Sequence, residues 1–104
     1  MDSFKSSQGS NLAKRNNLGK PQYSRIDYTL FEEVVKVLES ADSQYGRDNW
    51  KKGFPMTELI DSTMRHLFAF NSGEALDKSG FHHMAHAAAN MIFILNNLKN
   101  HPNL

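Results

Sequence analysis

The 104-residue chain contains no cysteine, only three prolines, and no apolar run long enough to cross a bilayer. Without cysteine there are no disulfides and no thiolate metal sites, which argues against a small extracellular scaffold. A transmembrane helix needs about 18 consecutive apolar residues, and the polar N-terminus lacks the apolar core of a secretory signal. We therefore expect a cytoplasmic location and no membrane contact. Any metal must be bound by His, Asp, Glu or Asn side chains.

Basic side chains are concentrated in the first 20 residues. This segment carries a local charge of +3, from Lys5, Lys14, Arg15 and Lys20 against Asp2. The rest of the chain carries eight Lys and Arg against ten Asp and Glu, a charge of −2. A nucleic-acid-binding domain would place its basic side chains on folded elements, so we expect no nucleic acid partner. We interpret residues 1–20 as a flexible basic arm and residues 21–100 as one domain.

Three segments have apolar residues at helical spacing, and no segment alternates as a strand does. The expected helices cover residues 29–38, 55–70 and 81–99. The first begins at Thr29, which has the spacing of a capping box with Glu32. Pro55 suits the first turn of the second. The sequence thus predicts an all-α fold, a small bundle of three main helices, in which residues 44–54 form a loop around a packed Trp50.

The third helix is apolar around most of its circumference from Met84 to Leu98. Two short helices cannot cover so much apolar surface, and exposed apolar patches of this kind mark association sites. We expect the bundle to be completed by oligomerisation, as a homo-oligomer.

A stripe of polar side chains interrupts this apolar helix. His83, His86 and Asn90 fall on one side at about 100° per residue, whereas His82 is expected to face solvent. Imidazoles three residues apart can share a divalent ion or grip one anionic group. They can equally cap a buried helix or bond across a subunit interface. The nearby carboxylates of Glu74 and Asp77 favour the metal interpretation.

Two further pairs permit both a structural and a functional interpretation. Arg65 follows Asp61 by four residues, so it can form an intrahelical ion pair or clamp a phosphate. Asn49 and Trp50 offer an amide that reads a base edge and a ring that stacks on it. They can also be a turn asparagine beside a core tryptophan.

Four carboxylates offer an alternative metal site. They form two pairs, each three residues apart and so on one helical face: Glu39 with Asp42, and Glu58 with Asp61. Oxygen ligands on facing helices are what Mg²⁺ prefers when it bridges phosphates. The sequence leaves open whether this set or the histidine cluster binds metal.

Several blocks of the sequence together resemble one known family. The blocks are GKPQYSRID (19–27), YGRDNWKKG (45–53), RHLFAF (65–70), SGEALDKSG (72–80) and HHMAHAAAN (82–90). Their order and spacing resemble the dATP/dGTP diphosphohydrolase N-terminal domain family of phages and bacteria. That family is similar to the all-α, MazG-like nucleoside triphosphate pyrophosphohydrolases, which are metal-dependent helical oligomers.

The resemblance implies metal-dependent hydrolysis of a purine (deoxy)nucleoside triphosphate to the monophosphate and pyrophosphate, with Mg or Mn as the cofactor. The resemblance gives the matching positions, and we assign them, together with Arg47, to three groups of site residues. Asp77, His83 and His86 are expected at the metal, and Glu74, Asp77 and His66 in catalysis. The substrate is expected to contact Arg47, Asn49, Trp50, Arg65 and Asn90.

Two alternatives belong to other functional classes. Where the family tends to show a glycine and lysines, this chain has Ala41, Ser43 and Gln44, so positive charge that meets a triphosphate is missing. A non-catalytic protein that sequesters a nucleotide, for example a phage counter-defence protein, fits that loss. In a purely structural helical adaptor the histidines would only join subunits.

Overall fold

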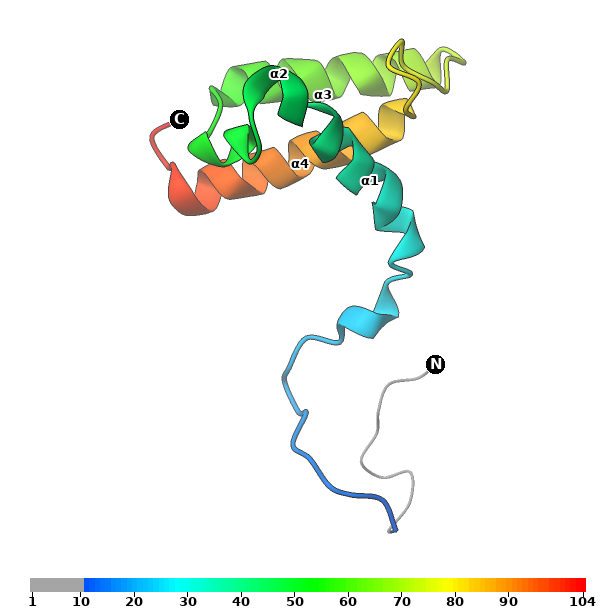
Figure 1. The fold of residues 1–104 in the computed structure, drawn as a ribbon, viewed down its shortest axis with the longest axis vertical. Coiled ribbons are helices and arrows are strands. Elements are labelled where there is room, and N and C mark those ends of the chain that lie inside the picture. The colour runs from blue at the N-terminus through cyan, green and yellow to red at the C-terminus, as the bar shows by residue number, and fades with distance from the viewer. Residues whose placement is uncertain (1–10) are drawn as a thin grey trace.

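The computed structural model describes residues 11–104, and they form the expected all-α bundle (Figure 1). The helices are α1 (Thr29–Ser40), α2 (Asp42–Tyr45), α3 (Met56–Asn71) and α4 (His83–Asn100). Short 3-10 turns occur at Tyr23–Arg25 and Asn49–Lys52. Within the described part of the chain, strand-like pairing is limited to one isolated bridge between Leu76 and His82. None of the helices in residues 11–104 is both long and apolar enough to span a bilayer.

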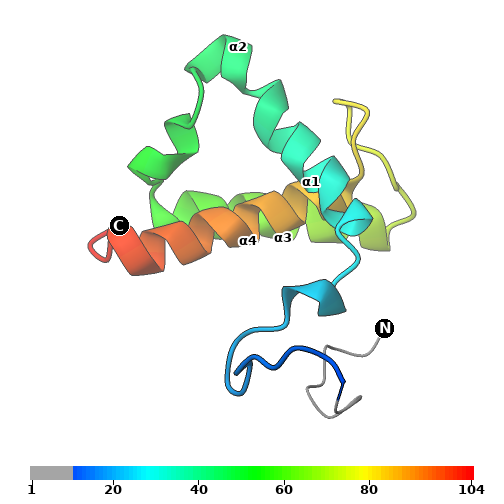
Figure 2. The same ribbon diagram turned by 60° about the horizontal axis from the view of Figure 1, so that its bottom comes forward.

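Helices α3 and α4 lie side by side, and α1 crosses α4 on the other side (Figure 2). The core between α1 and α4 consists of Val34 and Val37 against Ala85 and Ala89. Alanine at these positions lets the α1 backbone approach α4 closely, and the larger side chain of Phe93 fills the edge of the contact. Thus α4 is the central helix, and α1 packs on the face of α4 that carries the alanines.

The start of α1 agrees with the sequence, but its cap does not. The helix begins at Thr29, as predicted. The predicted capping box with Glu32 is wrong, because the Thr29 hydroxyl and backbone N–H both donate to Asp27 Oδ1, at 2.7 and 3.0 Å. An aspartate ahead of the first turn supplies the acceptor that the capping box was expected to provide.

Residues 41–55 are more regular than the predicted loop, since they contain α2 and a 3-10 turn. Trp50 is half-buried, as predicted, with its ring centroid 5.6 Å from that of Phe93. Phe54 lies 5.2 Å from the same ring. The fully buried Asn97 fixes this segment, because its Nδ2 donates to the Phe54 carbonyl at 2.6 Å and its Oδ1 accepts from the Phe54 N–H at 3.3 Å.

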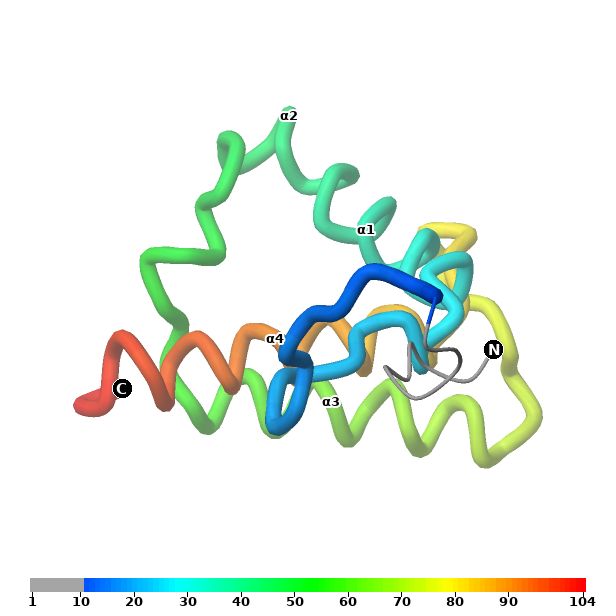
Figure 3. Tube along the Cα trace, turned by 90° about the horizontal axis from the view of Figure 1, so that it is seen from below, coloured from blue at the N-terminus to red at the C-terminus, as the bar shows by residue number. Residues whose placement is uncertain are grey.

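The predicted basic arm at residues 1–20 lies partly outside the described residues, which begin at residue 11. Residues 11–28 run away from the helices (Figure 1), and in the tube view from below they lie in front of α3 and α4 (Figure 3). Their hydrogen bonds are made with residues close by in the sequence. The helices therefore position the candidate site without help from this segment.

Candidate metal centre and adjoining cavities

The polar cluster forms where the loop between α3 and α4 folds back over the start of α4. The His83 N–H donates to the Ala75 carbonyl at 2.9 Å, and the Asp77 N–H donates to the Phe81 carbonyl at 2.8 Å. These backbone bonds fix loop residues 74–79 against α4. Helix α3 supplies His66 from the opposite side, so three elements contribute to one site.

Three side chains converge as metal ligands do. His66, Asp77 and His83 each offer a nitrogen or oxygen atom, and these atoms all lie within 4.8 Å of one another. The closest pair is His66 Nδ1 and His83 Nδ1, at 2.8 Å. His83 is buried, and the other two side chains are half-buried. Among residues 11–104 this is the one group of three such side chains that meets.

Glu74 fixes the tautomer of His83. The His83 Nε2–H donates to Glu74 Oε2 at 3.0 Å, although the carboxylate itself is 59% exposed. A carboxylate in this position keeps the proton on Nε2 and leaves the Nδ1 lone pair facing His66. His66 Nδ1–H then donates to His83 Nδ1.

His86 lies beside the cluster. Its ring stacks on that of His66, with the centroids 4.7 Å apart and the planes within 4° of parallel. Its Nε2 lies 2.8 Å from Ser79 Oγ and 3.6 Å from Asp77 Oδ2. The three residues that we expected at the metal, Asp77, His83 and His86, are thus brought together, and His66 lies among them.

The protonation states suit metal binding. Burial lowers the pKa of His66, and the nearby His86 lowers it further, so the imidazole is neutral at pH 7. The Ser79 backbone N–H donates to Asp77 Oδ2 at 3.0 Å and holds the pKa of that carboxyl below its ordinary value. A neutral imidazole and an ionised carboxylate are the forms in which these groups bind metals.

The donor set also fits a single divalent ion in its geometry. Two nitrogen ligands at right angles, each about 2.1 Å from an ion, are about 3.0 Å apart. The 2.8 Å separation of the two Nδ1 atoms is close to that value. The Asp77 carboxylate oxygen lies within 4.8 Å of both nitrogens. His66, Asp77 and His83 can therefore hold a metal, with Glu74 behind His83.

An apolar cavity of about 400 Å³ lies between α1, α2, the 3-10 turn and α4. Asn49 and Trp50, which we expected near a base, line it together with Phe54 and Phe93. His86 also lines this cavity. One histidine ring thus faces both the cavity and the cluster of ligating side chains.

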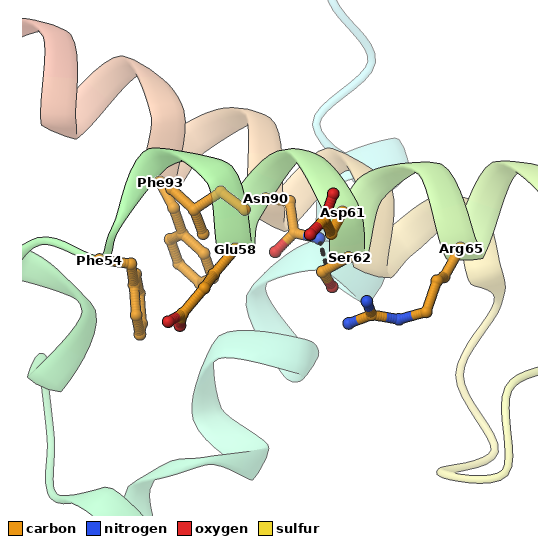
Figure 4. Close-up of a pocket in the computed structure, with 8 residues that line it drawn as sticks. Phe54, Glu58, Asp61, Ser62, Arg65, Asn90 and Phe93 are labelled. Atoms are coloured by element: carbon orange, nitrogen blue, oxygen red, sulfur yellow. Dashed lines mark hydrogen bonds between the residues drawn. The ribbon is translucent and has the colours of Figure 1, made fainter. Parts of the chain in front are cut away.

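A second, more polar pocket of about 410 Å³ contains Arg65 and Asn90, two of the expected substrate contacts (Figure 4). The Asn90 Nδ2 donates to Ser62 Oγ at 3.0 Å. Glu58 and Asp61 also line this pocket. Phe54 and Phe93 line both this pocket and the apolar cavity, so the expected substrate residues divide between two adjoining spaces.

Arg47 is exposed and contributes to neither space, although its neighbours Gly46 and Asp48 line the apolar cavity. The alternative set of four carboxylates does not converge within residues 11–104. Glu58 and Asp61 lie in the polar pocket, whereas Asp42 lines the apolar cavity. The histidine cluster is therefore the better supported of the two metal sites.

Sequence reasoning missed Ser79, Ser62 and the two phenylalanines that separate the pockets. Ser79 was detectable, because Asp77, Ser79 and Gly80 have the spacing of a turn in which an aspartate accepts from the backbone two residues later. Ser62 and Phe93 gain their roles only from the pairing of α3 with α4. The sequence carries no local signal for that register.

Comparisons with known proteins agree with the resemblance seen in the sequence. Residues 10–104 match the family model described as dATP/dGTP diphosphohydrolase, N-terminal. A dATP/dGTP diphosphohydrolase of Salmonella phage PMBT28 is 40% identical over 85 residues, which cover 81% of this chain. The chain spans only 29% of the length of that curated relative. No solved structure shows a significant match.

Proposed function

The chain belongs to the dATP/dGTP diphosphohydrolase N-terminal domain family, and we propose that it carries out metal-dependent hydrolysis of a purine (deoxy)nucleoside triphosphate. The products are the monophosphate and pyrophosphate, so water adds to phosphorus and one P–O bond to the oxygen that bridges the α- and β-phosphorus atoms breaks. The observation that carries the proposal is the meeting of His66, Asp77 and His83 beside a cavity large enough for a base. The phage origin of the relative supports the host cytoplasm as the proposed location.

Each group of residues has a separate task in this proposal. A divalent ion held by His66, Asp77 and His83 would neutralise triphosphate charge and lower the pKa of the attacking water. Glu74 keeps His83 in the tautomer that ligates, and Asp77 is the carboxylate among the three ligands. Arg65 approaches the phosphates from the polar pocket. Asn49 and Trp50 bind the base in the apolar cavity.

The imidazole ligands predict a metal preference. Two nitrogen donors and one oxygen donor suit Mn²⁺ better than Mg²⁺, which prefers oxygen ligands and retains its water. We expect calorimetric titration to give at least about tenfold tighter binding of Mn²⁺, following the general affinity order of such sites. Equal affinities, or tighter binding of Mg²⁺, would instead support an all-carboxylate site such as Glu58 with Asp61.

Base stacking on Trp50 predicts a specific loss of nucleotide affinity. Trp50→Leu is expected to raise the dissociation constant for dATP or dGTP roughly tenfold, since stacking contributes about 1–3 kcal/mol per base. The matched control is Phe70→Leu, which changes a half-exposed ring that lines neither cavity. Fluorescence titration with a labelled nucleotide measures both. If Trp50→Leu bound the nucleotide as tightly as the wild type, the base would not bind in the apolar cavity.

Binding and turnover measured together test the proposed activity. We expect pyrophosphate release from dATP or dGTP in the presence of Mn²⁺, and none after the metal is removed with a chelator. The missing positive charge at Ala41, Ser43 and Gln44 favours one alternative, a protein that retains the nucleotide. Tight binding with no pyrophosphate released by any metal would establish that alternative.

A further inference from the structure

Residues 11–28 carry large apolar side chains that nothing in the described chain covers. Leu18 is 92% exposed, Tyr23 84% and Tyr28 81%, and Leu12 and Ile26 are more than half exposed. Figure 1 shows this segment, called the arm below, leaving the helices at the start of α1. Exposed apolar side chains gathered on one short segment are costly in water and mark a surface that binds a partner.

A matching apolar face lies on α3 and α4. Ile60, Met64 and Leu67 are exposed on α3, and they follow one another at helical spacing. Met91, Leu95 and Leu98 do the same on α4.

Helical register places both stripes on one side of the α3–α4 pair. Each stripe lies on the side of its helix opposite the residues that line the polar pocket, which are Glu58 and Arg65 on α3 and Asn90 and Phe93 on α4. On α4 the stripe also points away from the alanines that pack on α1. We call this surface the α3–α4 face.

The arm and the rest of the chain have opposite charges. Within the arm, four basic side chains stand against Asp27 alone, a net charge of +3. Residues 29–104 hold seven Lys and Arg and nine Asp and Glu, a net charge of −2. Such complementarity favours association of the arm with a helical body of this chain.

We propose that the arm of one copy packs on the α3–α4 face of a second copy of this chain. The arm points away from the helices of its own chain and does not contact their α3–α4 face. The α3–α4 face of a second copy can cover it instead. Reciprocal exchange of two arms covers both arms and both faces in a closed two-fold dimer. This assembly is independent of the metal and of the proposed hydrolysis.

Paired variants test the contact from both sides by analytical ultracentrifugation. The double substitutions Tyr23→Ser with Tyr28→Ser, on the arm, and Met64→Ser with Leu95→Ser, on the face, each leave the α1–α4 core untouched. Each double substitution is expected to raise the dimer dissociation constant at least about tenfold, because it removes two apolar side chains from the contact. Tyr45→Ser, which changes a tyrosine 58% exposed on α2, is the control and is expected to leave it unchanged.

Mixing the two double variants separates arm exchange from other dimers. One variant keeps an intact face and the other an intact arm, so the mixture is expected to form heterodimers held by one intact arm–face contact, which neither variant forms alone. Dimerisation of the wild type is also expected to weaken as salt is added. A chain that stays monomeric, or a dimer that the arm substitutions leave unchanged, would overturn the proposal. The second result would assign the α3–α4 face to direct pairing with itself.

Discussion

Replacing His83 by alanine is expected to weaken divalent metal binding by at least about 100-fold and to abolish pyrophosphate release. His83 is the central ligand, because it contacts His66 through Nδ1 at 2.8 Å and Glu74 through Nε2 at 3.0 Å. Its loss removes one donor directly and frees His66 from the contact that orients it. Calorimetric titration with Mn²⁺ measures the affinity, and circular dichroism shows whether the helices remain.

Two further variants make this result specific. His82→Ala removes the adjacent histidine, whose side chain is 55% exposed and outside the cluster, and it should leave metal affinity unchanged. Glu74→Gln keeps the shape but loses the charge that fixes the His83 tautomer, and it should weaken binding about tenfold. Equal effects of His82→Ala and His83→Ala would contradict the assignment of His83 as a ligand.

Replacing Asn97 by alanine is expected to cause the largest loss of stability. Asn97 is completely buried and pairs with both backbone groups of Phe54. Alanine leaves that N–H and carbonyl without partners and opens a cavity, which together cost roughly 3 kcal/mol. For a domain of this size the melting temperature should fall by roughly 10–20 °C. Thermal unfolding followed by circular dichroism measures the shift.

The control for Asn97 lies one turn further along α4. Asn100 is exposed, and its Nδ2 donates only to Asn96 Oδ1, at 2.9 Å. Asn100→Ala should therefore change the melting temperature by no more than about 3 °C, as substitutions at exposed positions usually do. If both alanine variants melted alike, the buried amide would not be what holds Phe54 between the two cavities.

The fold followed from apolar periodicity to within a few residues. Helices α3 and α4 are long and strongly patterned, and they lie close to the predicted segments. The exact helix ends were set by local hydrogen bonds that compete with the predicted ones. Asp27 replaced the predicted capping box because it offers a better placed acceptor to Thr29. Helix α4 starts at His83, two residues later than predicted, because His82 has an extended backbone and is held by the bridge to Leu76.

The site followed from the sequence only in part. Helical spacing placed His83, His86 and Asn90 on one stripe, and the structure brings His83 and His86 to His66 whereas Asn90 lines the polar pocket. The 2.8 Å contact between His66 and His83 depends on the register of α3 against α4, and no local pattern encodes that register. The division of Arg65 and Trp50 between two cavities likewise arises from long-range packing around Phe93.

Nuclear magnetic resonance of the ¹⁵N-labelled imidazoles during a titration with Mn²⁺ tests most directly whether this cluster binds metal. We expect the signals of His66 and His83 to broaden first and to saturate at one ion per chain, followed by those of His86. His101, about 27 Å from His83 at the helical rise per residue, should broaden least. Broadening that is strongest at the amides of Glu58 and Asp61, or that never saturates, would contradict the account.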